Sequence, residues 1–216
     1  MNIDFIGEIG IEITTESVRT QLAAARGQPI TCRFFSEGGS VFEGFAISNA
    51  LREYAGSKTA IVDSAFSIAS YIVCAGGFDR VEMAANGWLM LHAPYSETKA
   101  PKPSEAKLLS SLQSQIADGY ALRSGKPLAT IQNMMTQETF LNAKEAVKWG
   151  FADSIIAGSQ SMAIAAKLRD KVQAKIMVGK SAIDQWRALV KIHGPSNANK
   201  LNPQLRQQVI QEGNKR

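Results

Sequence analysis

The feature that most limits the fold of this chain is an uncharged stretch from Ser64 to Phe78. Its larger part, SIASYIVCAGG, is too long and too rich in small residues for a strand, so we predict a buried helix there. The segment before it, KTAIVD at residues 58–63, is predicted to be a strand. A helix without a charged face belongs in the core of the protein, and its small residues allow close packing.

The rest of the first 156 residues alternates strand and helix patterns. Further strands are predicted at residues 2–10, 30–35, 80–85, 88–94 and 151–156, further helices at 14–27, 41–56, 104–125, 127–135 and 142–150, and a tight SEGGS loop at 36–40. Such alternation is typical of an α/β fold with mostly parallel strands. Beyond Ile156 only helix patterns remain. We therefore predict one domain over residues 1–158 and a basic helical C-terminal extension over residues 159–216.

The charge of the chain is concentrated in this extension. Residues 157–216 hold 11 Lys and Arg against 3 Asp and Glu, whereas residues 1–156 have a net charge of −3. This distribution argues against nucleic acid as a partner of the whole chain. The extension could bind an acidic partner or nucleic acid, or its charges could simply form a solvated helical surface.

The remaining composition favours a cytoplasmic protein without metal. No apolar run reaches the roughly 18 residues that span a bilayer, and the N-terminus lacks the basic region of a signal peptide. Cys32 and Cys74 have the spacing of neither a metal site nor a redox motif, so we expect buried free thiols in a reducing compartment. The two histidines, His92 and His193, lie far apart in the sequence, which argues against a metal site.

Three serines occur at even spacing at the start of the uncharged stretch: Ser64, Ser67 and Ser70. A serine at a helix N-terminus lies in a partial positive field beside free N–H groups, which stabilise a developing oxyanion. Ser67 is therefore a candidate nucleophile. Ser64 or Ser67 could instead cap the helix, and Ser70, one turn further along, is expected to be a small packing residue.

Two other segments carry candidate site residues. The SEGGS loop contains Gly38 and Gly39, and adjacent glycines let a backbone expose N–H groups to an oxyanion or a phosphate. The segment WLMLHAP places His92 at the end of a predicted strand. Strand ends of α/β folds are where sites collect.

Together these segments resemble the Clp-type serine proteases. The matching pieces are SEGGSVFEGFAI, SIASYIVCAGG, MLHAP and ETFLNAKEAVKWGFADSII, in the same order as in that family. Gly38 lies 29 residues before Ser67, and His92 lies 25 after it, as in the family. The resemblance covers roughly residues 3–156 and is strongest to the phage-encoded Clp-like head maturation (prohead) proteases.

The resemblance implies a crotonase-like spiral of ββα units and a serine endopeptidase that works through an acyl-enzyme. Ser67 matches the nucleophile, His92 the general base and Glu138 the acidic residue of the triad. Gly38 and Ile68 match the two oxyanion-hole donors. The chemistry implies no cofactor, no metal and, in the subunit itself, no ATP.

For partners, the resemblance implies a homo-oligomeric ring that acts on protein substrates and does not involve a membrane. If the phage likeness holds, the substrates are capsid or scaffold proteins, and the protein works in the host cytoplasm or the procapsid.

Departures from the family pattern leave alternatives open. Glu37, Asp63 and Phe66 stand where the family usually has Pro, Gly and Ala. A Ser–Lys peptidase would need a lysine near Ser67. A crotonase-type acyl-CoA enzyme would use the paired N–H groups but not a Ser67–His92 pair. A degenerate relative that only assembles or binds peptides would need neither the paired N–H groups nor the Ser67–His92 pair.

Overall fold

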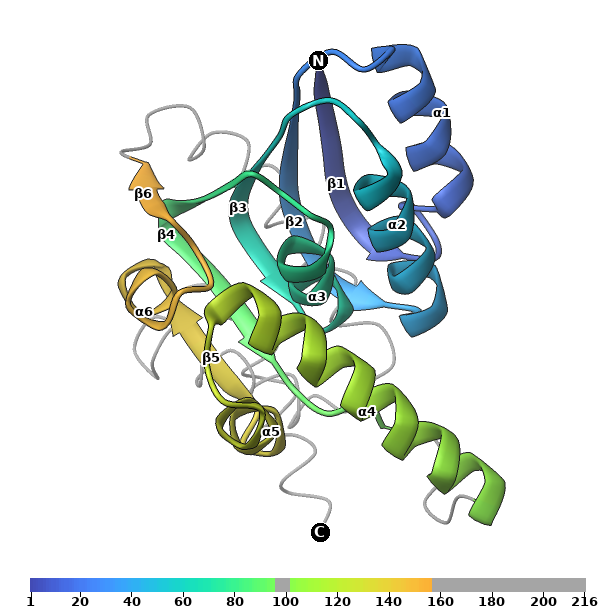
Figure 1. Ribbon diagram of the computed structural model, residues 1–216, viewed down its shortest axis with the longest axis vertical. Helices are drawn as coiled ribbons and strands as arrows, with labels where there is room; N and C mark the ends of the chain where they lie inside the picture. The colour runs from blue at the N-terminus through green and yellow to red at the C-terminus, as the bar shows by residue number, and fades with distance from the viewer. Residues whose placement is uncertain (96–101, 157–216) are drawn as a thin grey trace, which may run out of the picture. The chain divides into compact units, whose positions relative to one another are not determined.

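The computed structural model describes residues 1–95 and 102–156. Strands and helices alternate along these residues (Figure 1). In chain order they are β1 (Asn2–Ile9), α1 (Thr15–Ala25), β2 (Ile30–Gly39), α2 (Val41–Glu53), β3 (Lys58–Phe66), α3 (Ile68–Ala75), β4 (Arg80–Leu91), α4 (Pro103–Ser124), α5 (Leu128–Thr136), β5 (Thr139–Asn142), α6 (Ala143–Trp149) and β6 (Ser154–Ile156). The predicted mixed α/β class is confirmed. The predicted extension over residues 159–216 lies outside the described residues.

The strands form one sheet in the order β1-β2-β3-β4-β5, with β6 paired to β4. The pairs among β1 to β4 and the β4–β6 pair are parallel, and β5 runs antiparallel to β4. Helices α1, α2 and α3 lie along one face of the first three strands, and α4 packs beside α3 (Figure 1). The mostly parallel sheet therefore brings the C-terminal ends of β2, β3 and β4 to one edge.

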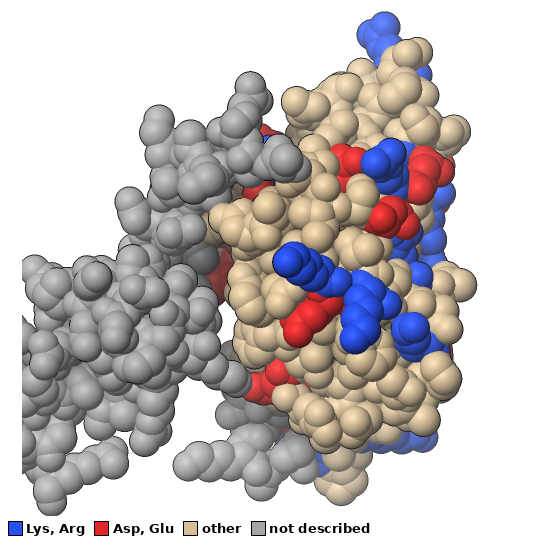
Figure 2. Space-filling model, turned by 90° about the vertical axis from the view of Figure 1, so that its left-hand side faces the viewer, with Lys and Arg blue, Asp and Glu red and all other residues tan. Residues whose placement is uncertain are grey.

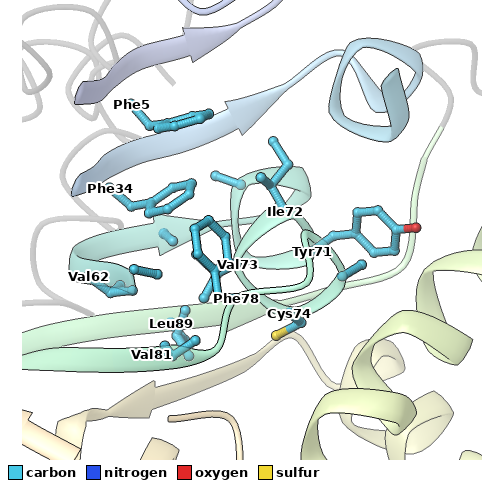
Figure 3. Packing of buried hydrophobic residues seen from close by; sticks show 14 of the residues in the cluster. Phe5, Phe34, Val62, Tyr71, Ile72, Val73, Cys74, Phe78, Val81 and Leu89 are labelled. Atoms are coloured by element: carbon cyan, nitrogen blue, oxygen red, sulfur yellow. The ribbon is translucent and has the colours of Figure 1, made fainter. Parts of the chain in front are cut away.

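Helix α3 is the centre of the packing, as its uncharged sequence predicted. Every one of its residues is buried. It contacts β2, β3 and β4 on one side and α2 and α4 on others. Figure 3 shows Ile72 and Val73 of α3 in the same buried cluster as Phe5 and Phe34 of the sheet, whose rings stack at 4.5 Å. Burying a side chain such as Ile72 contributes roughly 1.5–3 kcal/mol relative to leaving it exposed.

The predicted tight loop at SEGGS is wrong, because its first four residues continue β2. Gly38 pairs with Glu8 of β1, and Gly39 pairs with Ile9. Both glycines have positive φ, 104° and 139°, which side-chain-bearing residues rarely adopt. The glycines thus let β2 stay paired with β1 through an irregular stretch, and the sequence could not show this long-range pairing.

Two other boundaries differ from prediction. The two short strands predicted at 80–85 and 88–94 are one strand, β4, in which the register to β3 shifts between Met83 and Trp88. The AANG segment looked like a break because it carries this irregularity. Helix α4 begins at Pro103, one residue before its predicted start, because the missing N–H of proline is tolerated in a first turn.

The expected buried thiols are present, since Cys32 and Cys74 are both free and buried. Burial raises the pKa of each thiol to about 12, so both stay protonated at neutral pH. Among the described residues no helix is long and apolar enough to cross a membrane. On the face drawn in Figure 2, basic and acidic side chains of the described residues are interspersed rather than gathered by sign.

Replacing Gly39 by alanine tests the irregular β1–β2 pairing. A Cβ at Gly39 would lie 2.2 Å from the Ile9 carbonyl oxygen, so the paired backbones must separate. Gly27 is a matched control, because it also has positive φ (74°) but has nothing within 4 Å of its Cβ position. We expect Gly27→Ala to lower the free energy of unfolding in urea by about 1 kcal/mol. Gly39→Ala should lower it far more, and equal losses would contradict this pairing.

Candidate active site

Ser67 lies at the junction between β3 and α3, with φ 56° and ψ −130°. This backbone conformation is rare for a residue with a side chain, and such strain persists only where surrounding contacts impose it. Here the Ser67 N–H donates to the Met90 carbonyl oxygen at 3.0 Å. The Ser67 hydroxyl makes no capping bond to α3, so the interpretation of Ser67 as a simple cap is wrong. Ser64 does not cap the helix either, because it pairs within β3.

His92 follows the last residue of β4, and its Nε2 lies 2.6 Å from Ser67 Oγ. Residues 25 positions apart are therefore brought into hydrogen-bond contact by the parallel β3–β4 pair. The next residue, Ala93, donates its N–H to Met135 at the end of α5, which fastens this segment. Burial lowers the pKa of His92 below its ordinary 6.5, while the negative charge of Glu138 acts to raise it. A neutral imidazole beside a hydroxyl can accept its proton.

Glu138 lies in the turn between α5 and β5, close enough for its charge to act on His92. Its φ is 49°, a second strained position, and its N–H donates to the Met135 carbonyl oxygen at 3.2 Å. In the described part of the chain no side-chain hydrogen bond joins Glu138 to His92. Glu138 is thus close enough to His92 for its negative charge to act on the imidazole, without a hydrogen bond between the two side chains in the described residues.

Gly38 and Ile68, the predicted oxyanion donors, both lie next to Ser67, Gly38 in space and Ile68 along the chain. A Cβ at Gly38 would lie 2.6 Å from Ser67 Cβ and 3.2 Å from Ser67 Oγ, so only glycine fits beside this serine. Its N–H donates to Ser36 Oγ at 3.2 Å. Ile68 is the first residue of α3, and its N–H therefore has no partner within the helix. The Gly38 N–H thus points to Ser36 Oγ, and the role of both N–H groups as oxyanion donors stays a prediction.

The three departures from the family pattern have structural explanations. Asp63 is buried but forms a two-point ion pair with Arg33, at 2.6 and 2.9 Å. Phe66 packs edge-on against Phe140, with ring centroids 5.8 Å apart. Glu37 is half-buried, whereas its neighbours Ser36 and Gly38 are buried. Its side chain therefore lies on the face of β2 opposite to the buried side chains.

The buried lysine nearest in sequence to Ser67 does not form a Ser–Lys pair. Lys58 is the first residue of β3, whereas Ser67 follows its last, so the length of the strand separates them. The Lys58 ammonium donates to the carbonyl oxygens of Tyr54 and Gly56. The described residues contain no group of His, Cys, Asp and Glu side chains that could hold a metal ion.

The sequence did not reveal a buried polar cluster beneath Ser67. Ser70, expected as a packing residue, places its Oγ within 2.6 to 2.8 Å of the Ser67 and Met90 carbonyl oxygens and the Tyr120 hydroxyl. Tyr120 comes from α4, 50 residues further along the chain. The serine spacing hinted at Ser70, but nothing in the amphipathic pattern of α4 singled out Tyr120.

A serine in a strained strand-to-helix turn, with an imidazole on its hydroxyl, is typical of serine hydrolases on α/β scaffolds. Comparison with known proteins makes this class more precise. Residues 2–159 match the Clp protease family, and the chain belongs to that family. Its mixed α/β sheet is consistent with the crotonase-like fold expected from the sequence.

Three similar curated proteins each carry the name ATP-dependent Clp protease proteolytic subunit. The chain is 32% identical over 126 residues to the one from Pleurastrum terricola, a match that covers 56% of this chain and 64% of that protein. It is 28% identical over 124 residues to the one from Oltmannsiellopsis viridis, with the same coverage of 56% and 64%. It is also 28% identical over 124 residues to the one from Chlorella vulgaris, covering 56% of this chain and 62% of that protein. The chain thus spans less than two thirds of the length of these relatives.

The effect of the Glu138 charge on His92 can be measured by titrating the His92 imidazole by NMR. Because burial disfavours the charged form, the pKa of His92 should lie below 6.5. Glu138→Gln should lower this pKa further, because the carboxylate charge acts to raise it. The chain has two histidines, so the resonance that disappears in His92→Gln identifies the signal.

Glu53→Gln is the control, since this exposed carboxylate pairs with Arg19 and is not among the charges that act on His92. Because the folded protein binds the proton more weakly than the unfolded chain does, stability should fall as the pH drops below about 6.5. A His92 pKa above 6.5, or one unmoved by Glu138→Gln, would contradict the arrangement.

Proposed function

We propose that this protein is a serine endopeptidase in which Ser67 is the nucleophile, His92 the general base and Glu138 the acidic partner. The observation that carries the proposal is the 2.6 Å contact between Ser67 Oγ and His92 Nε2. A crotonase-type acyl-CoA enzyme has no need of this pair. Membership of the Clp protease family supports the same assignment.

In the proposed reaction, His92 Nε2 takes the hydroxyl proton as Ser67 Oγ attacks the peptide carbonyl carbon. The carbonyl π-electrons move to the oxygen, which the N–H groups of Ile68 and Gly38 stabilise. For Gly38 this requires its N–H to turn from Ser36 Oγ toward the new oxyanion. As the tetrahedral intermediate collapses, the C–N bond breaks and the imidazolium gives its proton to the leaving amine.

Water then hydrolyses the resulting ester on Ser67, with His92 again acting first as base and then as acid. His92 takes a proton from water, whose oxygen attacks the ester carbonyl, and the proton returns to Ser67 Oγ as the acid product leaves. The negative charge of Glu138 favours the imidazolium in both halves. The chemistry consumes only water and needs no cofactor.

We propose protein substrates and a homo-oligomeric ring for the assembled enzyme. The naming of its relatives as proteolytic subunits supports this proposal. The motif likeness to phage head maturation proteases further suggests capsid or scaffold proteins as substrates. On that proposal the enzyme works in the host cytoplasm or within the procapsid.

Reaction with a fluorophosphonate probe tests the nucleophile. We expect the wild-type protein to be labelled on Ser67, and Ser67→Ala to lose labelling and peptide hydrolysis while keeping its unfolding temperature. Ser64→Ala is the control, because Ser64 lies in β3 and should leave labelling intact. Label retained in Ser67→Ala, or mapped by mass spectrometry to another residue, would refute the assignment.

A chain ending at residue 158 tests the proposed domain boundary. The strands of the described sheet are complete at Ile156 of β6. We therefore expect the shortened chain to unfold cooperatively and to react with the probe at the wild-type rate. Aggregation, or loss of labelling in a soluble shortened chain, would show that residues 159–216 belong to the working domain.

A further inference from the structure

We propose that the hydroxyls of Ser70 and Tyr120, the Ser70–Tyr120 pair, position the nucleophile and its base for reaction. The inference rests on the proposed function and concerns residues that touch neither substrate nor reacting atoms. Both are enclosed, with 0% and 1% of their surface exposed. A hydroxyl pair buried this deeply is costly unless it is well bonded, so its contacts define what it does.

The contacts of the pair converge on two backbone carbonyls. Ser70 Oγ lies 2.6 Å from the Ser67 carbonyl oxygen and 2.8 Å from that of Met90. Tyr120 Oη lies 2.7 Å from Ser70 Oγ and 3.2 Å from the Ser67 carbonyl oxygen. One carbonyl belongs to the nucleophile residue itself, and the other lies two residues before His92. The pair therefore joins the two backbone segments that carry the reacting groups.

Two hydroxyl protons serve these contacts, in addition to the backbone N–H groups of Ser70 and Tyr71 that donate to the Ser67 carbonyl oxygen. If the Ser70 hydroxyl donates to the Met90 carbonyl oxygen, the Tyr120 hydroxyl can donate to the Ser67 carbonyl oxygen or to Ser70 Oγ. If the Ser70 hydroxyl donates to the Ser67 carbonyl oxygen instead, the Met90 carbonyl oxygen accepts only from the Ser67 N–H. Burial raises the pKa of Tyr120 far above its ordinary value, so its proton stays in place at any working pH. Removing one hydroxyl therefore leaves a buried carbonyl with one donor fewer.

The strain at Ser67 explains why the reacting pair would depend on these bonds. Neighbouring residues must stabilise its φ of 56° and ψ of −130°. Among the described residues, the Ser67 N–H donates to the Met90 carbonyl oxygen, and the Ser67 carbonyl oxygen accepts further hydrogen bonds. The carbonyl bonds restrict rotation of the same residue that carries Oγ. Relaxation there would swing Oγ away from Nε2, and misplacement by about 1 Å can cost on the order of 100-fold in rate.

Tyr120 also ties this geometry to helix α4. Its ring packs edge-on against Tyr71 at 6.3 Å and against Phe151 at 6.2 Å, which fixes the ring independently of its hydroxyl. Replacing Tyr120 by phenylalanine thus removes the hydroxyl while leaving the ring contacts. This makes Tyr120→Phe the cleanest probe of the pair, with Ser70→Ala as its counterpart.

The chain offers a matched control for each variant. Tyr71 is a buried tyrosine on α3 whose hydroxyl points away from the core side chains (Figure 3), so Tyr71→Phe controls for loss of a phenolic oxygen. Ser48 is a fully buried serine of α2 whose hydroxyl has no hydrogen-bond partner among residues 1–95 and 102–156. Ser48→Ala therefore controls for loss of a buried serine oxygen.

The experiment measures the second-order rate of fluorophosphonate labelling of Ser67 in the full chain, and kcat and KM on a model peptide. We expect Tyr120→Phe and Ser70→Ala each to slow labelling and kcat by 10-fold or more, with KM nearly unchanged. The double variant should lose less than the product of the single losses, because the two hydroxyls act as a unit. Both control variants should react at the wild-type rate.

Each other outcome has a definite meaning. Labelling of both variants at control rates would overturn the positioning role and leave the proposed function intact. Absence of labelling in the wild-type protein would remove the proposed function and this inference together. If Ser70→Ala fails to fold, Tyr120→Phe decides alone. If neither folds, or if kcat and KM change equally, the pair is a structural element and the proposal is wrong.

Discussion

The structure depends on the complete burial of α3. A helix of eight residues without a charge cannot remain at the surface, so the sheet covers one side of it while α2 and α4 cover others. This enclosure forces β3 to turn into α3 within a single residue, and that residue is Ser67. The uncharged stretch that dictates the core therefore also dictates where a reactive hydroxyl can lie.

The sharp turn strains the Ser67 backbone, and contacts with residues distant in sequence stabilise this conformation. Ser67 is strained, and its peptide groups are held by Met90 of β4 and by hydroxyls from α3 and α4. Met90 is two residues from His92, so the bond that holds the strained turn also sets the separation of hydroxyl and imidazole. Stability and the proposed chemistry thus share the same hydrogen bonds.

Much of this could be predicted from local sequence. The uncharged composition predicted a buried α3, and the alternation of patterns predicted a mostly parallel sheet. The resemblance to the Clp-type serine proteases implied the pairing of Ser67 with His92. The continuation of β2 through Gly38 and Gly39 could not be predicted, because it depends on pairing with β1. Nor could Tyr120, whose contact with Ser70 joins two helices and follows no periodicity. Glu138 was expected to orient His92, and its role there remains a prediction.

A crystal structure of the protein reacted with a peptide boronate would show whether Ser67 is the nucleophile. Boron forms a tetrahedral adduct that mimics the charge and shape of the proposed intermediate. The proposed mechanism predicts boron bonded to Ser67 Oγ and a boronate oxygen about 2.7–3.1 Å from the N–H groups of Ile68 and Gly38. An adduct on another residue, or one on Ser67 whose oxygens face away from both groups, would contradict it.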